Sequence, residues 1–422
     1  MPTIRGQRET IDISDLSYLG DGVGHVDGKL VVFVAGALPG EQVVAEIDER
    51  KPHYARGHMV ELVDSAPNRV RPPCPYVGRC GGCQVQHLDY PSQLDWKTGS
   101  VRQQLRRIGH LDADVVRPAI GAGHPWNYRN NARFSVDAEG NLGFTGPGSH
   151  DHVAVDNCRI MQEEIVALMP RLQRRFPGAH QVVVRYGART GQYVISPALA
   201  DQDATLPTGQ ASYEEILLGR SYRVSAPSFF QINTRVDVRP VFDGLTKEWP
   251  TRLATGYSMA ELLIALVLDR LALTGWEVVV DAYCGVGTFS LPIAERAREV
   301  IGIDEARSAV LDAEHNAADV ANARFLTGKT EDLIESLDRR PDAVVLDPSR
   351  LGCDPKVIEA IERLGPRTLV YISCDVATLA RDLRHLVANG YSLVEVQPID
   401  MFPQTHHVET VSLLRRVGAG EN

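Results

Sequence analysis

Residues 278–289 read VVVDAYCGVGTF, and the run EVIGID follows at 299–304. Further apolar runs of the same kind are DAVVLD (342–347), TLVYIS (368–373) and SLVEVQP (392–398). The helical patterns between these runs fall near 289–297, 305–320, 356–364 and 376–388. Apolar strands that alternate with amphipathic helices are typical of a parallel sheet covered on both faces. The sequence therefore predicts a doubly wound α/β domain, and the last run, at 406–416, is expected to form an antiparallel edge strand.

A glycine-containing turn follows the first of these strands. Gly285 and Gly287 would let the backbone pass close to a ligand at the carboxyl edge of the sheet, where open α/β sheets bind ligands. The next strand ends in Asp304, a carboxylate placed to accept hydrogen bonds from ribose hydroxyls. Position 290 is serine, not a third glycine at dinucleotide spacing, and no phosphate-anchoring lysine is present. The pattern favours S-adenosylmethionine over NAD or ATP, with a simple tight turn as the alternative.

Two more motifs follow strands of the same sheet. Leu346-Asp-Pro-Ser-Arg350 would place Asp347 in a rigid loop over the cofactor pocket, although an ordinary capped helix start would look the same. Cys374 comes just before a helix, whose dipole should favour the thiolate. With Glu409 on the last strand, Cys374 could form a pair of nucleophile and base, whereas burial as a structural thiol is the commoner fate of a cysteine.

Three closely spaced cysteines, Cys74, Cys80 and Cys83, have the character of a soft-metal site, and Cys158 is a possible fourth thiolate ligand. The pair Gly81-Gly82 would let backbone amides turn toward sulfur. Four thiolates suit either zinc or an iron–sulfur cluster, and their spacing does not decide between the two. Cys284 and Cys353 are expected to be structural.

Charge and hydropathy limit the classes of partner. The 422 residues carry 44 Lys+Arg against 54 Asp+Glu, a net charge of −10, which at first argues against nucleic acid. The segment Lys97–Arg189, however, has a surplus of +5 and the rest of the chain −15, so the middle of the chain could meet a polyanion. The longest apolar run, Leu262–Leu268, is far too short for a membrane span, and residues 1–10 lack a secretory signal. We expect a cytoplasmic protein with no membrane partner.

The chain divides into three predicted domains. Residues 1–65 alternate apolar and polar side chains between glycine-rich turns, a pattern that indicates a small OB-like β-barrel. Residues 66–230 begin with a proline-rich linker and continue as a mixed domain, with a helix at 92–108 and strands near 131–136 and 181–186. Residues 231–422 would form the α/β domain.

Together these residues resemble the RNA 5-methyluridine methyltransferase family, in its iron–sulfur branch with an N-terminal TRAM domain. The resemblance covers nearly the whole chain. It rests on the barrel at 1–63, CPYVGRCGGCQVQH at 74–87, YRNNARF at 128–134, FFQIN at 229–233, SCD…TLARD at 373–382 and MFPQTHHVET at 401–410.

The resemblance implies a Rossmann-like class I methyltransferase domain and assigns roles to individual residues. Cys374 would be the nucleophile that adds to carbon 6 of uracil, and Glu409 the base that removes the proton from carbon 5. The cofactor contacts would be Gln231, Tyr283, Gly285, Gly287, Thr288, Asp304 and Asp347. The family's [4Fe–4S] ligands correspond to Cys74, Cys80, Cys83 and Cys158. The partner would be RNA, 23S ribosomal RNA in preference to the transfer RNA T-loop, bound by a monomer.

Two departures from the family pattern and two other functions remain at this point. Ser349 stands where the family has a second proline, which would loosen the loop, and the apolar segment 258–271 would be an additional helix. A non-catalytic RNA-binding or redox-sensing protein with the same fold is the main alternative. DNA cytosine methylation uses the same carbon 6 addition but places its cysteine after proline, whereas here Ser373 precedes Cys374.

Overall fold

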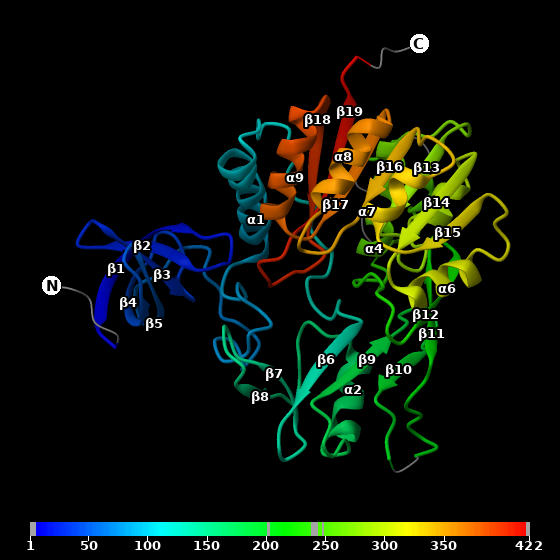
Figure 1. The fold of residues 1–422 in the computed structure, drawn as a ribbon. Helices are drawn as coiled ribbons and strands as arrows, with labels where there is room; N and C mark the ends of the chain where they lie inside the picture. The colour runs from blue at the N-terminus through cyan, green and yellow to red at the C-terminus, as the bar shows by residue number, and fades with distance from the viewer. Residues whose placement is uncertain (1–5, 201–202, 238–243, 247–248, 419–422) are drawn as a thin grey trace.

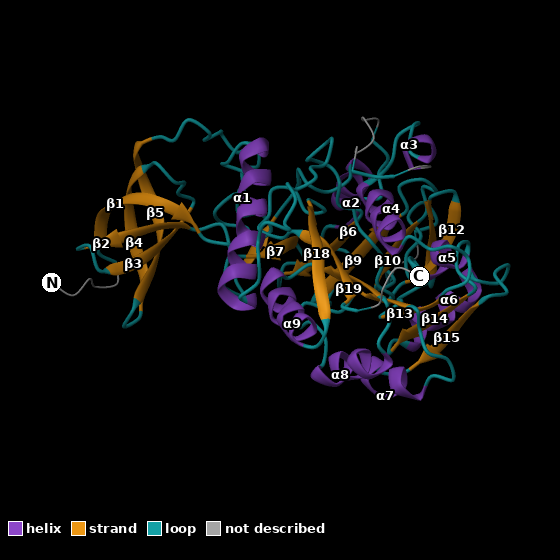
Figure 2. Ribbon diagram, turned by 90° about the horizontal axis from the view of Figure 1, so that it is seen from above, coloured by secondary structure: helices purple, strands orange, loops and turns teal. Residues whose placement is uncertain are grey.

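The computed structural model describes residues 6–200, 203–237, 244–246 and 249–418. Figure 1 shows a small barrel standing to one side, an antiparallel sheet below, and a large α/β sheet with its helices above. Helix α1 (Tyr90–Gln104) lies between the barrel and the rest of the molecule in the view of Figure 2. A π-helical turn at Leu105–Gly109 extends α1, so the helix predicted at 92–108 is present.

The N-terminal strands close into a barrel in the order β1-β2-β3-β5-β4. Their bounds are β1 (Arg8–Leu16), β2 (Gly22–Val26), β3 (Leu30–Ala35), β4 (Gln42–Arg50) and β5 (Tyr54–Asp64). Alternate side chains point inward as a pleated strand requires, and Val32, Val43 and Ile47 are fully buried in the barrel core. The predicted OB-like barrel is confirmed.

A buried ion pair joins the barrel to the segment that follows it. Glu41 is almost fully buried and receives the guanidinium of Arg69 at 2.5 Å (Nε to Oε1) and 2.7 Å (Nη2 to Oε2). The amides of Leu38 and Ala66 donate to the same carboxylate. Trp96 on α1 donates from its indole Nε1 to the carbonyl of Ser17 in the barrel at 3.2 Å. The proline-rich segment and α1 are therefore both held against the barrel by hydrogen bonds.

The central part is an antiparallel sheet in the order β10-β9-β6-β7-β8. Its strands are β6 (Asn131–Val136), β7 (Leu142–Thr145), β8 (His152–Ala154), β9 (Gln181–Tyr186) and β10 (Tyr193–Ser196). Helix α2 (Glu163–Leu172) packs Ile165, Met169 and Leu172 into the core of this sheet. A separate hairpin of β11 (Ser212–Leu217) and β12 (Arg220–Ser225) follows.

The C-terminal sheet has seven strands in the order β15-β14-β13-β16-β17-β19-β18. These are β13 (Val278–Ala282), β14 (Glu299–Asp304), β15 (Ala323–Thr327), β16 (Ala343–Leu346), β17 (Thr368–Ser373), β18 (Tyr391–Ile399) and β19 (Glu409–Arg416). The first five are parallel, and the fold is the predicted Rossmann-like one.

Helices cover both faces of this sheet. They are α3 (Trp249–Arg252), α4 (Met259–Leu271), α5 (Ser290–Ala294), α6 (Arg307–Asn316), α7 (Thr330–Leu333), α8 (Pro355–Leu364) and α9 (Val376–Ala388). Helices α4 and α5 pack on one face, and α1, α8 and α9 on the other. Helix α4 matches the additional helix predicted at 258–271. The three predicted domain boundaries stay predictions, although α1, which precedes the central sheet in sequence, shares its core with the α/β sheet.

In the C-terminal sheet, one strand was predicted at the wrong place and another was not predicted. The prediction that the last strand lies at the edge is wrong, because β19 is inserted antiparallel between β17 and β18. Strand β18 is the outer one, and the segment 115–120 lies along it through hydrogen bonds such as Arg117 N to Val396 O (2.9 Å). Strand β15 escaped prediction because it is a half-buried edge strand without a continuous apolar run.

Candidate active site

The glycine turn and Asp304 meet at the carboxyl edge of the sheet, as predicted. Gly285 and Gly287 have φ angles of +55° and +86°, which L side chains rarely adopt. The amide of Gly285 donates to Asp304 Oδ2 at 2.9 Å, and the amide of Ala306 donates to Oδ1 at 2.8 Å. Each carboxylate oxygen retains a second lone pair, so Asp304 is oriented and can still accept hydrogen bonds from a ligand.

Three carboxyl groups lie close together beneath this turn. Asp281 on β13 is fully buried and accepts a hydrogen bond from the hydroxyl of Ser290. Burial and the charge of Asp304 raise the pKa of Asp281 to about 7. Burial, Asp281 and Asp304 raise the pKa of Asp347 to about 8. A cationic ligand would relieve this repulsion, so the arrangement suits a positively charged cofactor.

Contacts with α6 bring the FFQIN segment (229–233) to the same edge. The hydroxyls of Ser225 and Ser228 donate to Asp312 on α6 at 2.7 and 2.8 Å. The side-chain amide of Asn316, also on α6, donates to the backbone carbonyl of Val286 in the glycine turn at 3.1 Å. Within the segment, Gln231 is buried, whereas the ring of Phe229 is 65% exposed.

The other two predicted cofactor contacts flank the turn. Tyr283 is half-buried with a φ of +70°, and its ring packs against the core on the face covered by α8 and α9. Burial and the neighbouring Cys353 raise the pKa of its phenol. Thr288 is buried at the end of the turn. Cys284 and Cys353 are both buried, consistent with structural thiols.

Strand register places Cys374 opposite Glu409. Strands β17 and β19 pair Ser373 with Thr410, whose hydroxyl donates to the Ser373 carbonyl at 3.0 Å. The next position outward on each strand is Cys374 on one and Glu409 on the other. Burial and Asp347 raise the pKa of Glu409 well above its ordinary value, and Arg350 opposes them.

The helix dipole does not lower the pKa of the Cys374 thiol, contrary to our expectation. Burial and the charge of Glu409 raise the pKa of Cys374 to about 12, although Arg350 lowers it. The first free amides of α9, from Ala377 and Thr378, donate to the side chain of Asp375 at 3.1 and 2.9 Å. Because Asp375 caps the helix, those amides do not point at sulfur.

Arg350 received no role from the sequence. Its guanidinium contacts Cys374 and lies 3.3 Å from Nε2 of His407. The signal was present, since an arginine follows Asp347 by three residues at an edge where other carboxyl groups were expected.

The loop that carries Arg350 is braced by α9. Thr378 Oγ1 donates to the Arg350 carbonyl at 3.2 Å, and Arg381 donates to that of Leu351 at 2.9 Å. Ser349, where we expected a looser loop, accepts a hydrogen bond from the amide of Leu351 at 3.4 Å.

The loop 401–407, which leads to Glu409, is held by residues about 300 positions away in sequence. Gln93 and Gln404 exchange two hydrogen bonds, at 3.0 and 3.1 Å. The amides of Gln84 and Val85 both donate to the Gln404 carbonyl at 3.2 Å. Tyr128 donates its hydroxyl to the Pro403 carbonyl at 3.0 Å.

A buried ion pair fixes the start of the same loop. Lys97 on α1 is 1% exposed, and its Nζ lies 2.5 Å from Oδ1 of Asp400, which is fully buried. The ammonium also donates to the Phe402 carbonyl at 3.1 Å. This pair was not predicted, because nothing near Lys97 in sequence marks its distant partner.

The four predicted metal-binding cysteines line one pocket, shared with apolar side chains such as Phe144 and Val155. All four are half-buried. Burial raises the pKa of Cys83 to about 12, with smaller contributions from the other three thiols. In the described part of the chain no three His, Cys, Asp or Glu side chains are arranged to hold a metal ion.

Across residues 6–200, 203–237, 244–246 and 249–418, no helix has the length and apolar character needed to cross a bilayer.

The sheet order, glycine turn and acidic edge define a class I S-adenosylmethionine-dependent methyltransferase. Residues 2–60 match the TRAM domain, and residues 259–417 match the family described as tRNA (Uracil-5-)-methyltransferase. An uncharacterized RNA methyltransferase of Gloeobacter violaceus is 36% identical, over 98% of this chain and 97% of its own. Another uncharacterized RNA methyltransferase, of Caldanaerobacter subterraneus, is 34% identical over 98% of this chain and 99% of its own.

Among solved structures, the tRNA (uracil-54, C5)-methyltransferase of Pyrococcus abyssi, in complex with S-adenosyl-L-homocysteine, has the same fold. The TM-score is 0.69 at 24% identity, covering 97% of this chain and 100% of that one. The chain belongs to the RNA (uracil-5-)-methyltransferase family with an N-terminal TRAM domain. It is an enzyme that takes its methyl group from S-adenosylmethionine and acts on RNA.

Proposed function

We propose that the protein methylates carbon 5 of one uridine in a structured RNA through a covalent adduct between Cys374 and carbon 6. The observation that carries this proposal is the register of β17 and β19, which sets Cys374 opposite Glu409 beside Asp347. Gln231, Tyr283, Gly285, Gly287, Thr288, Asp304 and Asp347 are the proposed cofactor contacts. The carboxyl groups at this edge favour the positively charged sulfonium.

Each group has one task in the reaction. The Cys374 thiol loses its proton to solvent, and its sulfur bonds to carbon 6, so that the ring becomes an enolate nucleophilic at carbon 5. S-adenosylmethionine supplies an electrophilic methyl group to carbon 5 and leaves as S-adenosylhomocysteine. Glu409, in its ionised form, then takes the proton from carbon 5, the bond between sulfur and carbon 6 breaks, and the carbon 5–carbon 6 double bond re-forms.

Electrostatics at the edge support this assignment. The contact with Arg350 favours the Cys374 thiolate, and a bound sulfonium would add a second positive charge beside the carboxyl groups. A carboxylate with a raised pKa is a stronger base than an exposed one, which suits Glu409 for removing a carbon-bound proton. The uracil must leave its stack to reach this edge, so a flipped base is required.

Methyl transfer tests the proposal directly. The protein is incubated with radiolabelled S-adenosylmethionine and RNA from a strain lacking the corresponding gene. Label should appear in 5-methyluridine, and Cys374→Ala should abolish it while cofactor affinity, measured by calorimetry, is unchanged. Label in another nucleoside, or full turnover by Cys374→Ala, would overturn the assignment.

For the RNA, we propose 23S ribosomal RNA, with the transfer RNA T-loop uridine as the second candidate. The combination of TRAM barrel and cysteine pocket supports the first, and the Pyrococcus abyssi neighbour, which acts on transfer RNA, supports the second. Mass spectrometry of separated ribosomal and transfer RNA from the deletion strain decides: the fraction that loses 5-methyluridine is the substrate.

We further propose that Cys74, Cys80, Cys83 and Cys158 hold a [4Fe–4S] cluster. Their shared pocket supports it, as does the amide of Gly82, which lies 3.4 Å from the sulfur of Cys80, because amide hydrogen bonds to sulfur are common in such sites. The cluster would supply a rigid cross-link between the segment 74–83 and Cys158.

Colour and metal content test the cluster without reference to turnover. Protein purified without oxygen should be brown and contain iron and sulfide, and Cys83→Ser should lose both. Colourless protein with stoichiometric zinc would replace the cluster by a zinc site. The matched control, Cys353→Ser, changes a buried thiol outside the pocket and should keep the colour.

A further inference from the structure

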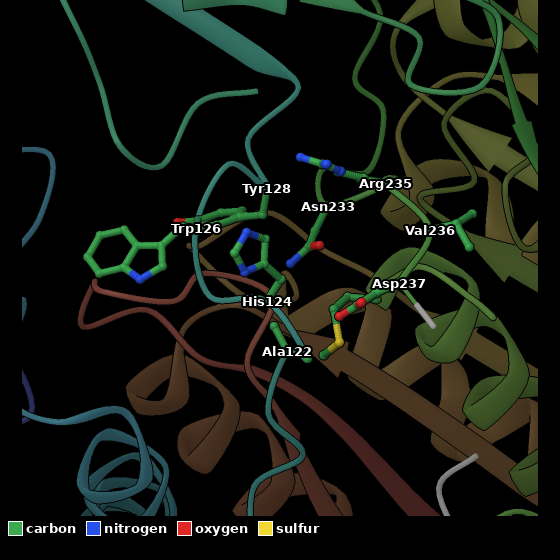
Figure 3. A pocket seen from close by; sticks show the side chains of 10 residues that line it. Ala122, His124, Trp126, Tyr128, Asn233, Arg235, Val236 and Asp237 are labelled. Atoms are coloured by element: carbon green, nitrogen blue, oxygen red, sulfur yellow. The ribbon is translucent and has the colours of Figure 1, made fainter. Parts of the chain in front are cut away.

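A second pocket is lined by none of the residues that the proposed chemistry uses. It is an open hollow between the segments 122–128 and 233–237, and Met259 also lines it. Figure 3 shows His124 and Trp126 on one side and Asn233, Arg235 and Asp237 on the other.

This pocket shares a wall with the loop that leads to Glu409. Tyr128, at its back, donates to the carbonyl of Pro403 at 3.0 Å, and Asn233 donates to that of Met401 at 3.3 Å. Asn233 also follows Gln231, a proposed cofactor contact, by two residues. A strand of RNA with one base at Cys374 could therefore place a neighbouring nucleotide in the pocket.

The chemistry of the lining fits a nucleotide. The exposed imidazole of His124 and the half-buried indole of Trp126 offer aromatic faces for base stacking. Arg235 is exposed and forms no ion pair within the described part of the chain, so its guanidinium is available to a phosphate. Stacking surfaces combined with a free cation are typical of sites for single-stranded nucleic acid.

One atom in the lining indicates which base. Oδ2 of Asp237 is buried and, among the described residues, has no hydrogen-bond partner. The backbone of Asp237 is fixed by reciprocal hydrogen bonds with Tyr257, both at 3.1 Å, so the side chain starts from a defined position. A buried carboxylate oxygen without a donor is costly, and a ligand that supplies an N–H would satisfy it.

We propose that this pocket binds a second unstacked nucleotide of the RNA substrate and prefers guanine. Guanine is the base whose Watson–Crick edge presents two adjacent donors, N1–H and the 2-amino group, to a carboxylate. Adenine and cytosine each place an acceptor beside their amino group, and uracil has a single donor between two carbonyls. The inference rests on the proposed function for the position of the target uridine.

Binding of short RNAs by the full chain with Cys374→Ala, which cannot turn over, tests the proposal. The probes are 5′-fluorescein-labelled hexauridylates that carry one G, inosine, A or C in turn at each internal position, and affinity is read from fluorescence anisotropy. At one position G should bind about 5- to 100-fold more tightly than A, C or U, the usual range for a good base contact. Inosine, which lacks the 2-amino group, should fall between.

Three variants assign the preference to the pocket. Asp237→Asn should abolish the preference for G while keeping the affinity for hexauridylate. Trp126→Ala should weaken every probe by about 5- to 100-fold, the usual range for lost stacking. Arg235→Gln should reduce the slope of log affinity against log salt by about 1, whereas Arg298→Gln, at the amino end of β14, should not.

Equal affinity for all bases, or an Asp237→Asn variant that still prefers G, would overturn the proposal. Because binding is measured without turnover, the two ideas can fail separately. A preference for G without methyl transfer by the unmodified chain would refute the uridine chemistry alone. Methyl transfer without a base preference would refute the pocket alone.

Discussion

The carboxyl edge of the sheet has two halves that are built in different ways. The cofactor half lies around Gly285 and Asp304, and the base half, where the uracil base would react, lies around Cys374 and Glu409. On the cofactor half, Gly285, Asp304 and Asp281 belong to β13, β14 and the turn between them, so the sheet itself fixes their positions. On the base half, the loop 401–407 has few partners in the sheet. Most of its hydrogen bonds to distant residues are made with α1 and with the segments beside the cysteine pocket, through Gln84, Gln93 and Tyr128.

This difference assigns a role to the N-terminal half of the chain beyond holding RNA. The same segment that carries Cys80 and Cys83 continues into Gln84 and Val85, whose amides hold the Gln404 carbonyl. The cofactor half should therefore tolerate damage to the N-terminal half, and the base half should not. Four predictions test that contrast, from the largest expected effect to the smallest.

The largest effect should come from Lys97→Met, which leaves the buried carboxylate of Asp400 without its partner. Removing one member of a buried ion pair costs about 3–5 kcal/mol. We expect a loss of that size in the free energy of unfolding, measured with urea. The matched control is Lys329→Met, since Lys329 is exposed and 3.8 Å from Glu331. An equal loss in both variants would show that the buried Lys97–Asp400 pair contributes no more to stability than the exposed pair.

Next in size is Gln404→Ala, which removes the side-chain half of the contact with Gln93. The loop that Gln404 holds leads to Glu409, the proposed general base. A catalytic group that is displaced by about 1 Å lowers the rate by about 100-fold, so kcat should fall by about 10- to 100-fold. The affinity for S-adenosylmethionine should not change. Gln181→Ala, on an exposed position of β9, serves as the control. If the affinity for S-adenosylmethionine fell as much as kcat, the cofactor half would depend on the same contacts as the base half, which would contradict the distinction between them.

In the cofactor half, the titration of Asp281 should make the stability of the protein depend on pH. The pKa of Asp281 is raised to about 7 in the folded protein, so the folded state retains a proton that the unfolded state releases near pH 4. Stability of the cofactor-free protein should therefore fall as the pH rises from about 4 to about 7.

Asp281→Asn removes that contribution. The variant should be more stable than the unmodified protein at pH 8 by about 1–3 kcal/mol, and the two should converge near pH 4. Urea unfolding at several pH values measures the difference, with Asp64→Asn at the exposed end of β5 as the control. Asp347, whose pKa is also raised, should leave a shallower slope in the variant, and an undiminished slope in Asp281→Asn would place its origin outside Asp281.

The smallest effect is expected from Ser349→Pro in the loop between the two halves. The loop is already braced by Thr378 and Arg381, so a stiffer residue adds little. The free energy of unfolding should rise by about 0.4–1 kcal/mol, the usual gain from a proline introduced in a loop, and turnover should be nearly unchanged. A large gain in kcat would mean that Ser349 does loosen the substrate side.

The sequence predicted those parts of the site that depend on local pattern. Apolar strands followed by Gly285, Asp304, Asp347 and Cys374 locate the carboxyl edge, because parallel strands all end there. The prediction failed where the partner is distant: the place of β19 in the sheet, the pairing of Lys97 with Asp400, and the support of Gln404. It also failed for the protonation of Cys374, because burial and a neighbouring carboxyl group outweigh the helix dipole and neither shows in a linear pattern.

The central claim, that Cys374 bonds to carbon 6 and Glu409 removes the proton from carbon 5, is tested most directly by Glu409→Gln. Without the base, the methylated adduct should accumulate, so a denaturing gel should show a protein–RNA complex that carries the labelled methyl group. The complex should disappear in the double variant with Cys374→Ala. Absence of any complex from Glu409→Gln under conditions where the unmodified chain turns over, or its persistence without Cys374, would contradict the account.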